Sequence, residues 1–200
     1  RLVRASDAGM GAIRYDESVP ACDALMTAEA GLPLLLCFAD CVPLLLSSRD
    51  GSLVAAVHAG RRGMLDGIVP ATINALQGAG VDPADLWAAV GPSICGSCYE
   101  VPDDMRALSA QREPACASRT SWGTPGLDVA AGVLAQLERA GVGHISAGHW
   151  CTYEDPRFYS FDGTERPGDW PASWSRDDVQ TTEYFLGVTF LKPEVGDTPG

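Results

Sequence analysis

Residues 34–63 read LLLCFADCVPLLLSSRDGSLVAAVHAGRRG, and the rest of the chain is organised around this stretch. Short apolar runs bounded by turn residues are typical of buried strands rather than helices. Asp50-Gly51 is a turn signal of the kind found in β-hairpins. The sequence therefore predicts a buried hairpin preceded by a further strand. The three apolar runs are 34–38, 42–46 and 53–57.

The predicted hairpin places Cys41 and His58 at or near strand ends, where each is followed by chain that can open onto a cleft. A thiolate and an imidazole brought together in this way are ligands that zinc and copper accept. Arg61 and Arg62 follow directly, and guanidinium groups bind phosphate or carboxylate. Taken singly, the two residues are better explained as a cysteine in the core and a histidine hydrogen-bonded to the backbone. The combination with Asp40 favours a functional site.

Composition limits the class of protein. The chain has 200 residues, 46% of them apolar, which is enough to build the core of a large domain. A net charge of −12 argues against nucleic-acid binding, so an anionic substrate has to be met by local arginines. No apolar run reaches the length of a membrane span, and no signal peptide opens the chain. The first residue is arginine, so we expect the N-terminus to be trimmed or incomplete.

The cysteines indicate the compartment. There are seven, an odd number with irregular spacing, which favours reduced thiols in the cytoplasm over a disulfide framework. Cys95 and Cys98 have C-x-x-C spacing, but no second such pair lies downstream, so a separate metal site is not the favoured interpretation. We instead predict a loop that lines the pocket, with Tyr99 and Glu100 as candidates for substrate contact.

Downstream periodicity predicts helices and one further buried strand. Apolar residues recur at helical spacing over 64–77 and 127–140, and a short helix is expected over 102–109. A strand is expected at 86–90, and the segment 111–126 is predicted to be loop. Strands alternating with helices and hairpins predict a mixed α+β domain, with sheets covered by helices.

Three further polar residues carry weaker signals. Asp23 is either a positioning group for the site or a cap or surface turn residue. His144 and His149 are predicted to be structural or surface residues.

A set of motifs then occurs in one order along residues 2–161, and together they resemble the laccase-domain family. This family is also called the multicopper polyphenol oxidase or purine nucleoside phosphorylase family. The motifs are Asp23-Ala24-Leu25-Met26-Thr27, Ala39-Asp40-Cys41-Val42-Pro43, Val57-His58-Ala59-Gly60-Arg61-Arg62-Gly63, Gly91-Pro92-Ser93-Ile94, Cys98-Tyr99-Glu100-Val101, Leu127-Asp128, Cys151-Thr152 and Arg157-Phe158-Tyr159-Ser160.

The resemblance implies a fold and an activity. It implies one layered α/β/β/α domain over 1–161 and metal-dependent phosphorolysis of adenosine- or inosine-type nucleosides, with adenosine deamination as a side activity. Cys41 and His58 would be metal ligands for zinc, with copper as the alternative, and Asp40 would join them in the catalytic site. Arg62 would hold phosphate. The expected partners are a small nucleoside and phosphate, with no nucleic acid and no membrane.

The chain also departs from the family pattern. The family's first metal-binding histidine lies in an upstream Gln-Val-His segment that these 200 residues do not contain. Arg61 stands where the family usually has tryptophan, so we assign the phosphate role to Arg62 alone. Ser97-Cys98 stands where two adjacent cysteines are usual. Beyond Phe161 the sequence is atypical, and we expect the tail 162–200 to be loosely held, with one strand within 180–191.

Three functions remain open at this point. The first is the phosphorylase. The second is a copper-dependent polyphenol oxidase, although three histidines are too few for multicopper centres. The third is a truncated, inactive family member that keeps the fold and weak metal binding.

Overall fold

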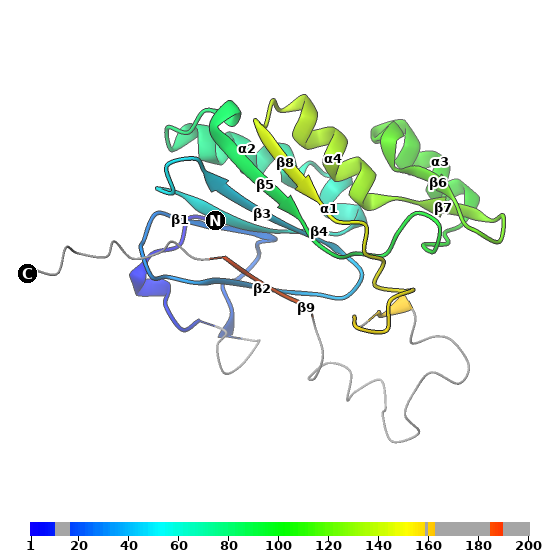
Figure 1. Ribbon diagram of the computed structural model, residues 1–200, viewed down its shortest axis with the longest axis horizontal. Coiled ribbons are helices and arrows are strands. Elements are labelled where there is room, and N and C mark those ends of the chain that lie inside the picture. The colour runs from blue at the N-terminus through cyan, green and yellow to red at the C-terminus, as the bar shows by residue number, and fades with distance from the viewer. Residues whose placement is uncertain (11–16, 159, 163–184, 190–200) are drawn as a thin grey trace, which may run out of the picture.

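The computed structural model describes residues 1–10, 17–158, 160–162 and 185–189, the last of these by backbone alone. Its centre is a five-stranded mixed sheet with the order β1-β4-β3-β5-β8 (Figure 1). All neighbours are antiparallel except β5 and β8, which run parallel. The strands are β1 (Ala24–Thr27), β3 (Val42–Ser48), β4 (Val54–Ala59), β5 (Leu86–Val90) and β8 (His144–Ala147).

The predicted hairpin is confirmed as β3 and β4. Leu44 lies opposite Val57 and Leu46 opposite Ala55, and the connection turns at Gly51, whose φ is 73°. The first apolar run forms β2 (Leu34–Phe38), outside the main sheet. Its partner is β9 (Phe185–Thr189), within the strand predicted for 180–191. The rest of the tail, 163–184 and 190–200, lies outside the described residues.

Helices cover one face of the main sheet, and the β2–β9 pair lies on the other (Figure 1). Leu44, Val57 and Ile73 belong to the large cluster under the helices, whereas Val54 and Ala56 pack with Leu34 on the β2 side. Burial of both faces explains why these strands read as continuous apolar runs rather than alternating ones. The α+β class with a mixed sheet is confirmed. The helices are α1 (Arg61–Leu65), α2 (Ile68–Gly78), α3 (Asp103–Arg112) and α4 (Val129–Arg139).

Two predicted boundaries are wrong. The helix predicted over 64–77 is two helices, because Gly67 adopts a left-handed φ of 87° between α1 and α2. The segment 111–126 is not all loop: α3 extends to Arg112, and β6 (Ala117–Arg119) pairs with β7 (Pro125–Leu127). The turn of this small hairpin is closed by Thr120 and Thr124, whose hydroxyl oxygens lie 2.7 Å apart.

Short 3₁₀ turns connect several of these elements. They are η1 (Ala5–Asp7), η3 (Pro83–Asp85) and η4 (Pro114–Cys116). Leu2 forms a single parallel bridge with Met26, so the N-terminus adds one residue pair beside β1. In the described part of the chain, no helix is long and apolar enough to cross a membrane.

Candidate functional site

The open end of the β3–β4 hairpin brings Cys41 and His58 together. Val42 pairs with Ala59 and Pro43 with His58, so Cys41, directly before β3, meets the chain just after β4. A side-chain carbon added to Gly60 would lie 2.9 Å from the Cys41 Sγ and 3.7 Å from the His58 Cε1. Both side chains therefore converge on one point above Gly60, which has to lack a side chain to admit them. The predicted juxtaposition of Cys41 and His58 is confirmed.

Asp23 orients the imidazole. Its Oδ1 lies 3.0 Å from the His58 Nδ1, and its backbone carbonyl accepts the His58 amide hydrogen at 2.7 Å. These contacts follow from the β1–β4 pairing, which sets Ala24 opposite Val57. With Nδ1 donating to the carboxylate, Nε2 is the nitrogen available to a metal, and a carboxylate behind a ligating histidine is the usual arrangement. Of the two roles left open for Asp23, the structure favours positioning.

Cys41 lies in a half-buried, negatively charged setting. Burial, together with the charges of Asp40, Asp162 and Asp23, raises the pKa of the Cys41 thiol to about 11. A free thiol with such a pKa is protonated at neutral pH and is a poor nucleophile. A bound cation reverses this situation, because a coordinating thiol loses its proton. The surroundings therefore suit Cys41 as a metal ligand better than as a covalent nucleophile.

Asp40 holds the loop that precedes β3 in place through several hydrogen bonds. It is buried and adopts a left-handed φ of 71°. Its carboxylate accepts hydrogen bonds from the Thr152 hydroxyl at 2.5 Å, the Ser160 hydroxyl at 3.1 Å and the Asp162 amide at 2.8 Å. Its carbonyl accepts from the Ile94 amide at 3.0 Å. Asp40 thus ties the residues before β3 to segments more than fifty and more than one hundred residues away. Its catalytic role stays a prediction.

The other predicted site residues are Tyr99, Glu100 and Arg62. Tyr99 is half-buried and hydrogen-bonded by Arg61; burial raises the pKa of its hydroxyl, although the arginine opposes that shift. Glu100 is exposed, and its Oε2 accepts a hydrogen bond of 2.5 Å from the Trp122 Nε1. Arg62 is exposed on α1. The guanidinium that contacts Tyr99 therefore belongs to Arg61, the residue that the sequence analysis set aside.

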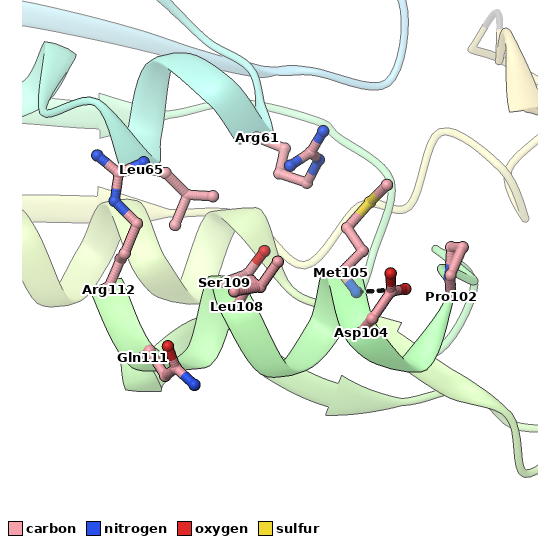
Figure 2. Close-up of a pocket in the computed structure, with 9 residues that line it drawn as sticks. All are labelled: Arg61, Leu65, Pro102, Asp104, Met105, Leu108, Ser109, Gln111 and Arg112. Atoms are coloured by element: carbon pink, nitrogen blue, oxygen red, sulfur yellow. Dashed lines mark hydrogen bonds between the residues drawn. The ribbon is translucent and has the colours of Figure 1, made fainter.

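A groove runs between α1 and α3 beside this arginine. It has a volume of about 610 Å³, within the range of small-molecule pockets. Figure 2 shows Arg61 and Leu65 from α1 facing Met105, Leu108 and Ser109 from α3. Its walls are apolar in the middle and charged at the ends. The complete lining is Arg61, Leu65, Pro102, Asp104, Met105, Leu108, Ser109, Gln111 and Arg112.

Among the residues that the structure describes, Cys41 and His58 belong to no set of three ligand atoms close enough to hold one ion. They fit two positions of a zinc or copper site, and a third protein ligand has to come from elsewhere. One set of four does occur: the ligand atoms of Cys95, Cys98, Cys151 and Glu154 all lie within 4.8 Å of one another. We call these residues the four-ligand cluster. The C-x-x-C pair, which the sequence did not favour as a separate metal site, thus has two further candidate ligands beside it.

The sequence carried a signal for that cluster. Cys151-Thr152-Tyr153-Glu154 repeats the same spacing with a carboxylate as its second ligand, so the second pair is C-x-x-E rather than C-x-x-C. His144, by contrast, stacks on Trp87 at 4.6 Å between ring centroids on the surface of β5 and β8, which agrees with the predicted structural role.

Three comparisons with known proteins bear on this site. The curated relatives found include a purine nucleoside phosphorylase of Streptomyces coelicolor, 50% identical over 73% of this chain and 60% of its own length. Another is a purine nucleoside phosphorylase of Streptomyces griseus, 44% identical over 73% of this chain and 59% of its own. The chain therefore spans about 60% of the length of the curated relatives it matches.

Solved structures similar to this chain are also found. YlmD from Geobacillus stearothermophilus superimposes with a TM-score of 0.80 at 32% identity, covering 96% of this chain and 68% of that protein. YfiH from Bacillus licheniformis gives 0.79 at 30% identity, covering 96% and 70%. The family model described as "Multi-copper polyphenol oxidoreductase laccase" matches residues 3–169, which include the hairpin, Asp40 and the four-ligand cluster. The resemblance inferred from the motifs is thereby confirmed, and the chain belongs to the multi-copper polyphenol oxidoreductase laccase family.

Proposed function

We propose that the chain carries the site of a metal-dependent purine nucleoside phosphorylase that works in the cytoplasm. The observation that supports this most is the convergence of Cys41 and His58 over Gly60, with His58 oriented by Asp23. Relatives named purine nucleoside phosphorylase share up to 50% identity with this chain over 73% of its length. The described residues contain seven free cysteines, in keeping with a reducing compartment.

The reaction is a displacement at the ribose. A phosphate oxygen attacks C1′ of adenosine or inosine, and the bond between C1′ and the purine nitrogen breaks. The bonding electrons leave with the base, which takes up one proton, so the products are ribose 1-phosphate and the free purine. Such a reaction needs a cationic group for the phosphate, a group that stabilises the departing base, and exclusion of competing water.

Residues of this chain supply these parts in the proposal. Arg62 binds phosphate, and Tyr99, held by Arg61, orients the nucleoside. Arg61 also lines the groove between α1 and α3. Cys41 and the His58 Nε2 hold zinc, or copper as the alternative. A bound zinc ion would act as a Lewis acid or lower the pKa of water, which also fits adenosine deamination. Asp40 keeps the Cys41 loop in place.

Polyphenol oxidation is the competing function, because the matching family model carries that description. Multicopper oxidation needs a type 1 centre and a trinuclear centre, both rich in histidine. The 200 residues contain three histidines, and His144 lies on β8, which the sheet order separates from β4 by two strands. We therefore place phosphorolysis first.

The test is an assay of adenosine plus phosphate for ribose 1-phosphate and adenine, with zinc and copper content measured on the same sample. We expect phosphate-dependent product that falls at least about 100-fold in Cys41→Ala. Cys37→Ala is the matched control, since Cys37 is exposed on β2. Ammonia release from adenosine without phosphate measures deamination separately.

Two further outcomes decide between the alternatives. Arg62→Ala should raise the KM for phosphate, whereas Arg49→Ala, which removes a surface arginine near Asp85, should not. Full phosphorolysis in Cys41→Ala would refute the assignment of the site. Oxygen-dependent oxidation of a phenol with no phosphorolysis would favour the oxidase, and a chain inactive in both assays would be a non-catalytic family member.

A further inference from the structure

The four-ligand cluster is built from two short segments with the same spacing. Cys95 and Cys98 lie three residues apart in one loop, and Cys151 and Glu154 lie three apart in another. Each segment is a tight turn: the Cys98 amide donates to the Cys95 carbonyl at 3.0 Å, and the Asp155 amide donates to the Cys151 carbonyl at 3.0 Å. Two ligands from each of two turns is the arrangement typical of structural zinc sites.

Backbone pairing fixes the two turns against each other. Ser93 and Cys151 form a parallel bridge, in which the Thr152 amide donates to the Ser93 carbonyl at 3.1 Å. The Cys95 amide also points at the Cys151 Sγ, 3.4 Å away. An amide hydrogen directed at a sulfur stabilises negative charge there, which a metal thiolate carries and a neutral thiol does not.

The turn that carries Cys95 and Cys98 also packs tightly against the rest of the fold. A side-chain carbon on Gly96 would lie 2.6 Å from the Ser118 Oγ and 2.7 Å from the Asp128 Cβ, so the turn packs directly on β6 and on the start of α4. Asp128 in turn caps α4 by accepting from the Ala131 amide at 2.8 Å. The sulfur positions are therefore set by the rigid part of the fold.

The chemistry of the donors selects the ion. Cys98 and Cys151 are buried beside Ile94, Cys95 is half-buried, and Glu154 is exposed at the rim. Three thiolates and one carboxylate form a four-coordinate, closed set of net charge −4. Soft sulfur ligands favour zinc over magnesium or calcium, and a set with no open position fits a structural rather than a catalytic ion.

We propose that Cys95, Cys98, Cys151 and Glu154 bind a structural Zn²⁺, separate from the site at Cys41 and His58. The ion would clamp the loop after β5 to the segment that follows β8. Thr152, next to Cys151, donates to Asp40, so the clamp would also support the loop that carries Cys41. The proposal does not depend on the phosphorylase assignment.

Cobalt titration of the metal-free, reduced chain tests the proposal. Co²⁺ bound by several thiolates gives intense sulfur-to-metal absorption in the near ultraviolet, and zinc then displaces it. We expect this absorption in the wild type and in Cys41→Ala, both with one tightly bound equivalent at the cluster. Glu154→Gln, a change at an exposed ligand, should weaken cobalt binding at least about tenfold. Cys95→Ser should reduce the absorption per bound ion.

The cobalt titration has a control variant and defined contrary results. Cys22→Ser alters a half-buried cysteine outside the cluster and should leave the spectrum unchanged. Loss of the thiolate absorption in Cys41→Ala, or an unchanged spectrum and affinity in both Glu154→Gln and Cys95→Ser, would overturn the proposal. So would a protein purified under reducing conditions in which two of the three sulfurs form a disulfide. Activity is not the readout, so an inactive chain can still confirm the site.

Discussion

The Cys41–His58 site and the four-ligand cluster are built in opposite ways. The first lies at the end of one hairpin, and its two residues are fixed by the register of β3 and β4. The second joins two loops 56 residues apart and is fixed by one bridge, by Gly96 and by the Cys95 amide, which points at the Cys151 Sγ. The hairpin site has fewer described ligands than a metal needs, whereas the cluster has a complete set. A strand register thus presents ligands precisely, and a loop junction can close a coordination shell.

The largest effect should come from Gly60→Ala. Gly60 has a φ of −72°, so alanine adds no backbone strain, but its methyl would lie 2.9 Å from the Cys41 Sγ. Displacement of a site residue by about 1 Å costs about 100-fold in rate. We expect phosphorolysis to fall by about that factor while cobalt binding at the cluster persists.

Gly63→Ala is the matched control, because the nearest atoms to its added carbon are 3.6 Å away. Equal losses in the two variants would show that the hairpin end does not depend on the close approach of Gly60 to the thiol.

A smaller effect is expected from Asp23→Asn. The amide keeps the size of the side chain but not the charge that holds the His58 Nδ1 proton. Loss of such a partner weakens metal binding by about tenfold to 100-fold. Metal affinity measured by competition with a chelator should show this at the hairpin site only. Asp85→Asn, with the same exposed side-chain fraction of 59%, should change nothing.

Thr152→Val tests whether the two sites are coupled. It removes the hydroxyl that donates to Asp40 and leaves a buried carboxylate with one partner fewer. Loss of a hydrogen bond to a charged group costs about 1.5–3 kcal/mol. Urea denaturation should show a decrease of this size, together with weaker activity. Thr72→Val, equally buried but bonded to a helix carbonyl, should cost less; an equal loss would mean that Asp40 is not the cause.

The comparison also explains what could be predicted from the sequence. Residues 34–63 are a local pattern, and turn chemistry at Asp50-Gly51 determines which strand ends meet, so the pairing of Cys41 with His58 could be predicted. For the four-ligand cluster the sequence shows only two pairs with the same spacing. That the two pairs meet could not be predicted, because the register between Ser93 and Cys151 is set by tertiary packing and not by any turn between them.

Other errors have similar causes. The apolar period runs unbroken through Gly67, whose left-handed φ of 87° separates α1 from α2. The β6–β7 hairpin has few apolar residues, so its sequence lacks the pattern that predicts strands. One of its positions is Gly126, which lies against the backbone at Gly96 and Tyr99. The direct partner of Tyr99 was missed because Arg61 differs from the family pattern, and that pattern carried the assignment to Arg62.

The smallest effect is expected at Glu113, which ties the chain after α3 to α4. Its carboxylate is buried and receives hydrogen bonds from Gln136 and from Arg139. Burial raises the pKa of Glu113, but these donors outweigh it and hold the pKa below its usual value. Its contribution to stability is therefore complete above the unfolded-state pKa of about 4.3 and is lost as pH falls through the lower folded-state value.

Glu113→Gln should accordingly destabilise the fold at pH 7 by about 1 kcal/mol, a figure kept low because Arg139 is 59% exposed. The difference from wild type should shrink as pH falls below about 4.3 and through the lower folded-state pKa of Glu113. Urea denaturation at several pH values measures this, with the exposed Glu138→Gln as control. A pH-independent difference would mean that packing, not charge, holds this region.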